Sequence, residues 1–522
     1  MKKKPEKESS EGLPVRLTRR EFLKAAAAAG LALYMPGLLS GKAPRVAEAA
    51  AAKRVMVGQG VDIESWDPYG HSSTVGYNIW QHFMEPLVRF DFERKRFQPV
   101  LAESWKNEDG VNWVFKLRRG VRFTDGSELS AADVIYSLER VLSGSRQAPT
   151  LRDVSKVSAR DTSTVVVTTK KPVAPFLHAL SNKVILSSVA AKRYGSEMDK
   201  HPIGTGPFRF AEWIRGTRLV ANRNEDYWGS APKIDQAVWL PIPEDAARMT
   251  ALETGACDLV TNVPPHEAAR LASSPGIKVV SVESLRHMFI CLNHKFKPLD
   301  NRLVRKAICH AVDVESIIRY VLEGRATRLA GPLARPVFGY DPALKPYDYD
   351  PRKARELLSQ AGYPQGFEVD FYTPTGRYIK DREISQAIAA QLAEVGIRAQ
   401  LKTPEWAMLS NMFMDGKLPM VYIGRGAISD PDDYLAQYFR TGGSVRCNYS
   451  NPEVDRLLDL QRETTDEAKR EVILRDAVRT IHDDAAMVFL FTYDDIYAMS
   501  KKLVWKPRPD EYVFLFEAEV RG

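Results

Sequence analysis

Short strand-like runs alternate with amphipathic segments of helical period along this chain of 522 residues, from about residue 55 to its end. Residues 113–117 and 367–372 have the apolar and aromatic pattern of strands. Residues 305–322, 351–361 and 383–395 carry apolar side chains at helical spacing. No stretch repeats at a fixed period, which argues against a repeat architecture. The pattern predicts an α/β fold with additional β-hairpins.

The first 49 residues have the order of a secretory signal: basic residues, an apolar run at 25–39, then small residues up to Ala49. The apolar run, about 15 residues long, is too short to cross a bilayer core of roughly 30 Å. An amphipathic helix of the mature protein is the alternative, but the run has no polar face. The segment TRREFLK at 18–24 resembles the twin-arginine export motif. We therefore expect cleavage near Ala49 and export of the folded protein to the periplasm.

Charge and size limit the classes of protein that the chain can belong to. The formal net charge is +8, and residues 1–49 contribute +5 of it, because they hold ten Lys and Arg against five Asp and Glu. The remaining chain has no cluster of Lys and Arg that would follow a phosphate backbone, so we expect no nucleic-acid partner. Length and a hydrophobic content of 44% suit a globular protein of two or three domains.

The sequence lacks the motifs of common catalytic sites. It has no G-x-S-x-G, H-E-x-x-H, P-loop or dinucleotide-binding glycine motif, and its nine His residues are scattered. Asp430, Asp432 and Asp433 could bind calcium or act as paired carboxylates, but they lack the spacing and the glycine of a calcium loop. A helix cap or a solvated loop is the alternative for this acidic trio. We expect a binding protein rather than an enzyme, with no metal and no cofactor.

Four cysteines, Cys257, Cys291, Cys309 and Cys447, have neither C-x-x-C spacing nor the spacing of a zinc site. One disulfide is permitted in an oxidising compartment. Four buried thiols are the alternative, and export after folding favours it, because the chain then folds in the reducing cytoplasm.

A series of short motifs follows in order from about residue 62 to the C-terminus. Each motif is weak alone, but the ordered set resembles family 5 extracellular solute-binding proteins, the receptors of ABC importers for peptides, nickel and opines. The motifs describe a scaffold: Asp-Gly and Arg-Gly steps predict hairpins, and residues 350–358 predict a capped helix with Pro in its first turn. They identify a fold and not a ligand. The matching segments are PVLAESW (99–105), DGVNWVFKLRRGVRFTDG (109–126), ADV (132–134), GTGPF (204–208), NRNEDYW (222–228), RMTALETG (248–255), VRKAI (304–308), DPRKARELL (350–358), AGY (361–363), AAQL (389–392), VGI (395–397) and YSNPEVD (449–455).

The resemblance implies a two-lobed periplasmic-binding-protein fold, class II and of the large three-subdomain type, with a hinge between the lobes. The strand-like runs at 288–293 and 487–492 would cross the hinge, and a ligand would favour closure by contacting both lobes. The implied partners are a small-molecule ligand and the permease and ATPase subunits of an ABC importer at the inner membrane, and the protein is expected to be a monomer. The implied domains are a lobe I core from 53–98, 203–288 and 490–522, a smaller β-rich subdomain of lobe I at 99–202, and lobe II at 289–489.

The resemblance also marks one position where this chain departs from its family. Peptide-binding members hold the ammonium group of the ligand with an Asp four residues before the Pro of an Asp-Pro motif. Here that Pro is Pro431, and Ala427 occupies the position of the Asp. The missing clamp disfavours a free peptide N-terminus, and Arg425, two residues earlier, would instead favour an anion.

Arg377 lies roughly where dipeptide receptors place an Arg against the ligand carboxylate, a group that guanidinium binds bidentately. A surface or lobe-packing Arg is the alternative. Trp406 follows a strand-like run in a loop that could stack on the ligand, and a core tryptophan is the alternative there. The candidate ligand-binding residues are Arg377, Trp406, Arg425, Asp430, Tyr434, His71 and Tyr77.

These residues predict an anionic or sugar-bearing small ligand, such as an opine-like conjugate or a blocked peptide, in preference to an ordinary free peptide. Two other functions stay open from the sequence. One is a metal-chelate or haem receptor of the same fold, and the other is a cleft hydrolase that uses Asp430 and Asp432.

Overall fold

The structure is a computed structural model, and the leader predicted at 1–49 and the candidate residue His71 lie outside the residues that it describes. The strand predictions at 113–117 and 367–372 are confirmed by β5 (Asn112–Leu117) and β15 (Phe367–Tyr372). Among the described residues, no helix combines the length and the apolar character needed to cross a membrane. The described residues are 53–70, 73–145, 147–335, 337–443 and 445–521.

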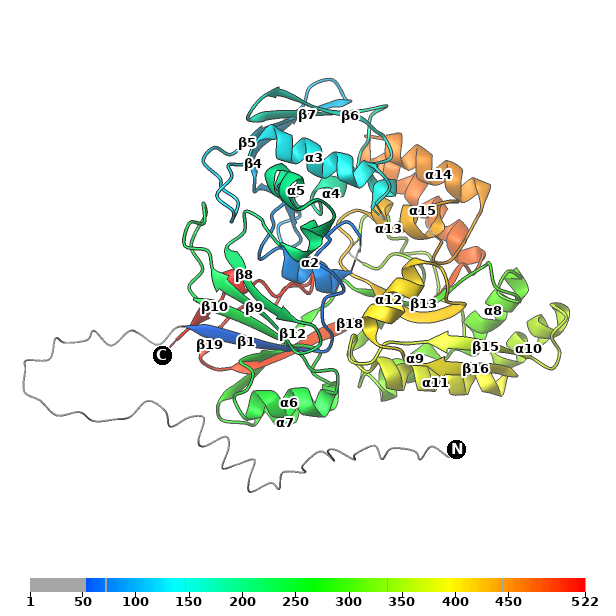
Figure 1. Ribbon diagram of the computed structural model, residues 1–522. Coiled ribbons are helices and arrows are strands. Elements are labelled where there is room, and N and C mark those ends of the chain that lie inside the picture. Colours follow the sequence, from blue (N-terminus) through cyan, green and yellow to red (C-terminus); the bar gives the residue numbers. More distant parts are fainter. Residues whose placement is uncertain (1–52, 71–72, 146, 336, 444, 522) are drawn as a thin grey trace, which may run out of the picture. The chain divides into compact units, whose positions relative to one another are not determined.

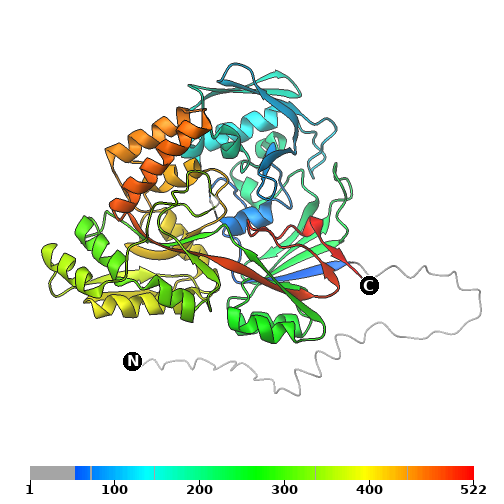
Figure 2. The same ribbon diagram turned by 180° about the vertical axis from the view of Figure 1, so that it is seen from behind.

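One long strand, β18 (Met487–Ser500), connects two groups of strands into a twelve-stranded mixed sheet (Figures 1 and 2). Its first half pairs antiparallel with β13 (His287–Leu292) and β14 (Ala326–Arg328). Its second half pairs antiparallel with β11 (Leu259–Val260) and β12 (Ile277–Glu283). The strand is almost entirely buried, as its run of apolar and aromatic residues requires.

The first group, here called the β1 group, is built around β1, which is parallel to both of its neighbours. Val55 and Val57 of β1 are buried. Helices α6 (Asp245–Glu253) and α7 (Pro265–Ala272) pack on this group. Its strands are β11, β1 (Arg54–Gln59), β10 (Gln236–Pro241), β9 (Arg218–Arg223) and β8 (Phe208–Ile214), with β12 beside β18.

The second group, here called the β13 group, is centred on β13, whose six residues are all buried. In this group β15 runs parallel to both β16 and β17, and β17 runs antiparallel to β13. Its strands are β13, β17 (Met420–Arg425), β15, β16 (Ile397–Lys402) and β14. The helices of this part of the chain are α8 (Arg302–Ala311), α9 (Val314–Tyr320), α10 (Pro351–Gln360), α11 (Asp381–Glu394), α12 (Trp406–Met414), α13 (Pro431–Phe439), α14 (Pro452–Glu463) and α15 (Glu467–Asp483).

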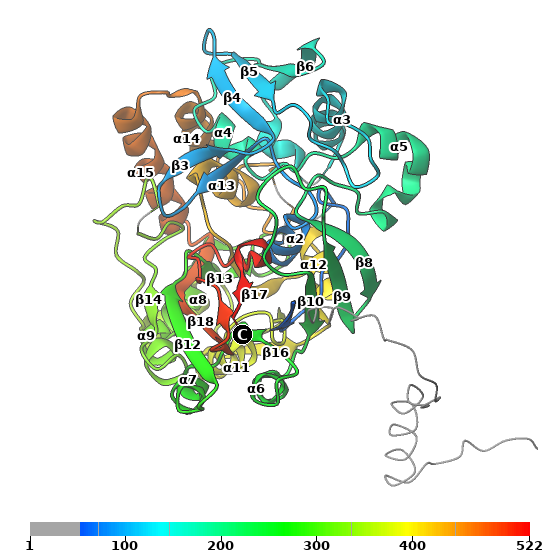
Figure 3. The same ribbon diagram turned by 90° about the vertical axis from the view of Figure 1, so that its left-hand side faces the viewer.

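A separate four-stranded antiparallel sheet, with the order β4-β5-β7-β6, carries helix α3 against β6 and β7 (Figure 3). The backbone N–H of Ser130, the N-cap of α3, donates to Asp133 at 2.8 Å, so the reciprocal bond of a capping box fixes this helix start. The members of this sheet and its helix are β4 (Ala102–Asn107), β5, β7 (Thr164–Thr169), β6 (Val154–Asp161) and α3 (Ala131–Leu142). The remaining elements are α2 (Thr74–Trp80), β2 (Val88–Asp91), β3 (Arg96–Pro99), η1 (Ala148–Leu151), α4 (Phe176–Leu180), α5 (Ser188–Tyr194), η2 (Gly195–Lys200), β19 (Leu503–Val504), η3 (Leu515–Glu517) and β20 (Glu519–Val520).

The helix predictions are correct for two segments and wrong for a third. Helices α10 and α11 confirm the predictions at 351–361 and 383–395. The single helix predicted at 305–322 is two helices, α8 and α9. Val312 between them has extended backbone, and the Asp313 carboxylate accepts from the N–H of Ser316 at 3.0 Å, which begins a new helix. The apolar spacing continues across this break and so conceals it.

The four cysteines are buried and free, so the structure holds no disulfide among them and agrees with the expectation of four thiols. The Sγ of Cys447 donates to the carbonyl of Tyr438 at 2.6 Å. The Sγ of Cys291 donates to the carbonyl of Arg446 at 3.8 Å.

Candidate functional site

A cavity with about 980 Å³ of empty space, open to solvent, lies where the two groups of strands meet. On one side it is lined by Thr74 and Tyr77 of α2, the helix that follows β1 in the chain. On the other side it is lined by Trp406, which begins α12, and by Arg425 at the end of β17. The wall therefore combines segments that lie more than 300 residues apart in the sequence.

Arginine dominates the charge of this wall. No Asp, Glu or Lys is present among the described residues that line the cavity. Two of the arginines have a carboxylate behind them, since Arg286 pairs with Glu511 and Arg425 pairs with Asp433. Such a surface favours a ligand that carries carboxylate or other anionic groups. The arginines that define this space, here called the arginine cavity, are Arg89, Arg286, Arg377, Arg425 and Arg446.

Arg377 owes its position to a tight loop after β15. The backbone N–H groups of Gly376, Arg377 and Tyr378 donate to the Asp381 carboxylate at 3.2, 2.9 and 3.0 Å. Burial raises the pKa of Asp381 to about 7, against the opposing effect of these three donors. Gly376 has a φ of +75°, and a Cβ at this position would lie 2.3 Å from the carbonyl oxygen of Pro243, so the loop requires glycine.

The guanidinium group of Arg377 is held by aromatic rings rather than by a carboxylate. It lies 4.7 Å from the ring centroid of Tyr378 and 5.4 Å from that of Trp406. Its Nε is buried and has no hydrogen-bond partner. Arg377 is 8% exposed and lines the cavity, so its guanidinium is a fixed cation at the cavity wall.

Trp406 both lines the cavity and joins its two sides. Its indole Nε1 donates to the Glu64 carboxylate at 2.7 Å, and the other oxygen of that carboxylate accepts from Ser73 Oγ at 2.8 Å. Glu64 and Ser73 belong to the segment between β1 and α2, whereas Trp406 belongs to the β13 group. The sequence left a stacking residue and a core tryptophan as alternatives, and the position of Trp406 has features of both.

Arg425 and Ala427 also line the cavity, as does Tyr77. The Nη2 of Arg425 donates to Asp433, and its buried Nε has no hydrogen-bond partner. Ala427 supplies no charge, whereas peptide-binding members of the family that the motifs resemble would carry an Asp at this position. This part of the wall is therefore cationic and lacks a counter-ion for an ammonium group.

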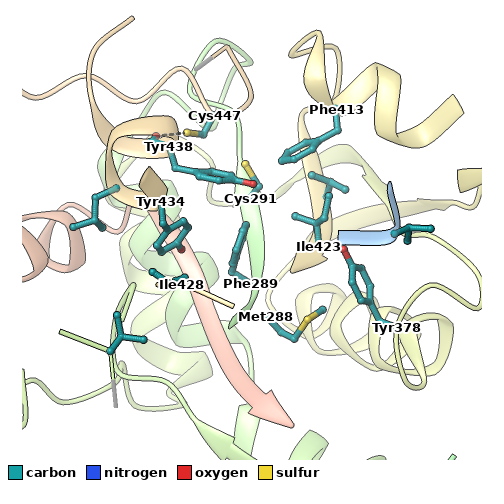
Figure 4. Packing of buried hydrophobic residues seen from close by; sticks show 14 of the residues in the cluster. Met288, Phe289, Cys291, Tyr378, Phe413, Ile423, Ile428, Tyr434, Tyr438 and Cys447 are labelled. Atoms are coloured by element: carbon teal, nitrogen blue, oxygen red, sulfur yellow. Dashed lines mark hydrogen bonds between the residues drawn. The ribbon is translucent and has the colours of Figure 1, made fainter. Parts of the chain in front are cut away.

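Two candidate residues lie away from the cavity wall. Asp430 is buried and accepts from Arg470 Nη1 and Nη2 at 2.7 and 2.6 Å. Burial alone would raise the pKa of Asp430, but the Arg470 guanidinium holds that pKa below its usual range. Tyr434 is fully buried, with ring centroids 6.1 Å from Phe289 and 5.3 Å from Tyr438 (Figure 4). Neither residue is among those that line the arginine cavity.

The acidic trio of the D-P-D-D segment is fully engaged in ion pairs. Asp430 pairs with Arg470, Asp432 with Arg462, and Asp433 with Arg425. Asp430 also accepts from the N–H of Asp432 at 2.9 Å as the N-cap of α13, which agrees with the helix-cap alternative. Because two of the three carboxylates are buried against arginines, the trio does not present the paired catalytic carboxylates of a cleft hydrolase. Among the described residues, no group of three or more His, Cys, Asp and Glu could hold a metal ion.

Sequence reasoning missed Arg89, Arg286 and Arg446. Arg286 donates through Nη2 to Thr74 Oγ1 at 3.0 Å and lies 5.2 Å from the ring centroid of Tyr378, so it touches both sides of the cavity. None of these arginines belongs to a motif, and their convergence depends on the pairing of distant strands. A signal available in the sequence was the position of Arg286 at the start of the predicted hinge strand.

Comparison with known proteins places this geometry in a family. The family described as bacterial extracellular solute-binding proteins, family 5 middle, matches residues 96–445. The glutathione-binding protein GsiB of Pectobacterium atrosepticum is 31% identical over 486 residues, which cover 90% of this chain and 94% of that protein. The structure of DppA of Helicobacter pylori in complex with the peptide STSA aligns with a TM-score of 0.85 and 29% identity. The alignment covers 90% of this chain and 98% of that one. Against AgaA of A. tumefaciens R10 in complex with agropinic acid, the TM-score is 0.83 with 26% identity, covering 90% of this chain and 99% of that one.

These matches confirm the α/β periplasmic-binding-protein fold and the solute-binding function expected from the motifs. The relatives are ligand-binding components of transport systems and not enzymes. Since the family match covers residues 96–445, more than half of the chain, the protein belongs to family 5 of the bacterial extracellular solute-binding proteins.

Proposed function

We propose that this protein delivers a small, multiply acidic ligand of the glutathione or opine type to an ABC importer. The observation that carries the proposal is the wall of five arginines in a cavity whose described lining residues include no Asp, Glu or Lys. Arg286 and Arg425 pair with Glu511 and Asp433 behind the wall, but the described lining itself supplies no carboxylate, so the wall favours a ligand that brings its own carboxylates. GsiB relatives named as glutathione-binding and AgaA in complex with agropinic acid support this class, since both ligands are acidic.

Ala427 supports the same ligand class by exclusion. A free peptide needs a counter-ion for its N-terminal ammonium group, and this position supplies none. A peptide whose N-terminal amino group is blocked needs no counter-ion at this position. The same holds for a peptide that is linked through a side-chain amide and for an opine. Arg377 and Arg425 remain the proposed carboxylate contacts, with Tyr77 and Trp406 as aromatic contacts, because all four line the cavity.

We further propose that binding works by closure of two lobes. The lobe I core would comprise 53–98, 203–288 and 490–522, and lobe II would comprise 289–489. The pairing of β13 with the first half of β18, and of β11 and β12 with its second half, supports a hinge formed by these strands. The mature protein would act as a monomer that presents its closed, loaded form to the permease.

The ligand class is tested by titration calorimetry with three probes: glutathione, agropinic acid and tri-alanine. Binding of at least one acidic probe and no binding of tri-alanine are expected. Mass spectrometry of the native protein would identify any ligand that co-purifies from the periplasm. Tight binding of tri-alanine that is unchanged by Arg377→Ala and Arg425→Ala would contradict the proposed site.

Export through the twin-arginine route, with cleavage near Ala49, is the remaining part of the proposal. The motivation is the pair Arg19-Arg20 before an apolar run. Replacing both arginines by Lys is expected to leave uncleaved precursor in the cytoplasm, which immunoblotting of cell fractions measures. N-terminal sequencing of the exported protein checks the cleavage site. Normal export of the double variant would contradict this route.

A further inference from the structure

A second cavity, with about 490 Å³ of empty space, adjoins the arginine cavity. Thr74 and Arg377 line both spaces, so the two cavities are immediate neighbours. The second cavity differs in charge, because Asp495 and Glu511 line it. A cationic cavity and a cavity with acidic residues therefore lie side by side.

Glu511 already has a cation. Arg286 donates to it through both Nε and Nη2, and Ser284 Oγ donates to it at 3.0 Å. The charge of Arg286 is thus balanced within the protein. Arg377, the other cation near Asp495, stacks against Tyr378 and Trp406 and makes no ion pair with a carboxylate.

Asp495, by contrast, makes no close ion pair among the described residues, although Ser284 donates a hydrogen bond to it and Arg286 and Arg377 lie near enough to favour its charged form. It belongs to the second half of β18, is 5% exposed, and its Oδ2 is buried without a hydrogen-bond partner. Burial raises the pKa of Asp495 well above its usual range, and the neighbouring Glu511 adds to this effect. A buried polar atom with no partner at the wall of a cavity indicates a partner that arrives with a ligand.

We propose that Asp495 is the cation subsite of this receptor, where its carboxylate accepts hydrogen bonds from a primary ammonium group of the bound ligand. The inference rests on the proposed function, since the arginine cavity would hold the carboxylates of the same molecule. It narrows the ligand to an amino-acid-like zwitterion with more acidic groups than amino groups. The ammonium group would then be bound by Asp495 of β18, and not at the position of Ala427, where peptide-binding members of the family carry an Asp.

The test compares glutathione with glutaryl-cysteinylglycine, which keeps both carboxyl groups and lacks only the amino group. Calorimetry of the wild-type protein is expected to give at least roughly tenfold tighter binding of glutathione, as one charge-assisted hydrogen bond accounts for. Asp495→Asn is expected to abolish this preference by weakening glutathione alone. The matched control is Asp494→Asn, because Asp494 is the preceding residue of β18 and lines neither cavity.

Thermal unfolding separates this role from a structural one. Removing a buried, unpartnered carboxyl is expected to leave the Tm of Asp495→Asn at pH 7.5 unchanged or higher, whereas loss of a structural residue would lower it. Equal wild-type affinity for the two probes, or a preference that survives Asp495→Asn, would overturn the inference while the proposed function stands. Binding of neither probe would overturn the proposed ligand class, and this inference with it.

Discussion

Arginine is used in two different ways in the neighbourhood of helix α13. At its start, Asp430 and Asp432 are buried against Arg470 and Arg462, so that each carboxylate has its own guanidinium. In the arginine cavity nearby, cations line a space whose described wall contains no carboxylate. In the first arrangement each carboxylate faces its own guanidinium, whereas in the second Arg286 and Arg425 have carboxylates behind them and the described lining itself supplies none. Residue type alone therefore does not mark a binding site, and the balance of charge around a cavity does.

Breaking the complete cluster should have the largest effect. Arg462 donates to Asp153, to Asp432 and, at 2.9 Å, to the carbonyl of Thr150. Arg462→Ala would leave two buried carboxylates without their partner, so we expect the free energy of unfolding to fall by about 3–5 kcal/mol. Urea denaturation followed by circular dichroism measures this loss.

Arg456→Ala is the matched control for that prediction. Arg456 lies on the same helix, α14, but its pair with Glu453 is exposed, so we expect little change in the free energy of unfolding. If the two variants lost similar stability, the cluster would not have the structural role assigned to it.

Removing a cavity arginine should affect binding and leave folding intact. Arg377→Ala removes a guanidinium that makes no ion pair with any residue in the described part of the chain, so the Tm should change little. We expect affinity for an acidic ligand to fall by about 1.5–3 kcal/mol, because a hydrogen bond to a charged group is lost. Calorimetry and thermal unfolding on the same preparation measure both quantities. A large loss of Tm with unchanged affinity would assign Arg377 to packing between the lobes.

Lobe closure can be tested without altering any charge. A Cβ at Gly60, in the loop after β1, would lie 1.6 Å from the carbonyl oxygen of Gly376, so Gly60→Ala forces these backbones apart. We expect affinity to fall by about 1–3 kcal/mol, the usual cost of overpacking, because the loop of Gly376 that positions Arg377 is pushed away from Gly60. Small-angle scattering should show a more open bound form. Gly276→Ala is a control for glycine replacement away from this contact, since nothing lies within 4 Å of its added Cβ and its φ is not in the left-handed region.

The contrast between Asp430 and Asp495 predicts how the stability of the protein depends on pH, an effect smaller than those of the preceding variants. Arg470 holds the pKa of Asp430 below its usual range, so its stabilising contribution is present above the unfolded pKa and is lost only as the pH falls through the lower folded pKa. The pKa of Asp495 is raised, so its contribution has the opposite sign: the protein loses stability as the pH rises above the unfolded pKa of Asp. Between pH 5 and 8, the Tm of Asp495→Asn should therefore fall less steeply than that of the wild type. Parallel curves would mean that Asp495 titrates normally.

The sequence was sufficient for the scaffold and for part of the cavity wall. Strand and helix periods predicted β5, β15, α10 and α11, because each follows from local spacing. Motifs near Asp-Pro and Thr-Gly-Arg directed attention to Arg377 and Arg425, which line the cavity.

The remaining features depend on contacts between distant segments. Asp430 and Tyr434 looked available for a ligand, but their environments are set by α15 and β13. Arg286 lies next to the predicted hinge strand, but its ion pair with Glu511 forms only after β18 has joined the two groups of strands, and Asp495 gave no signal at all. Local patterns do not contain such information on charge balance.

The most direct test of the central claim compares the affinity of glutathione with that of its dimethyl ester, in which both carboxyl groups are blocked. If the arginine cavity recognises carboxylates, calorimetry at one pH and ionic strength should show that esterification costs about 3–6 kcal/mol, since two charge-assisted contacts are lost. Equal affinity for the acid and the ester would contradict the account.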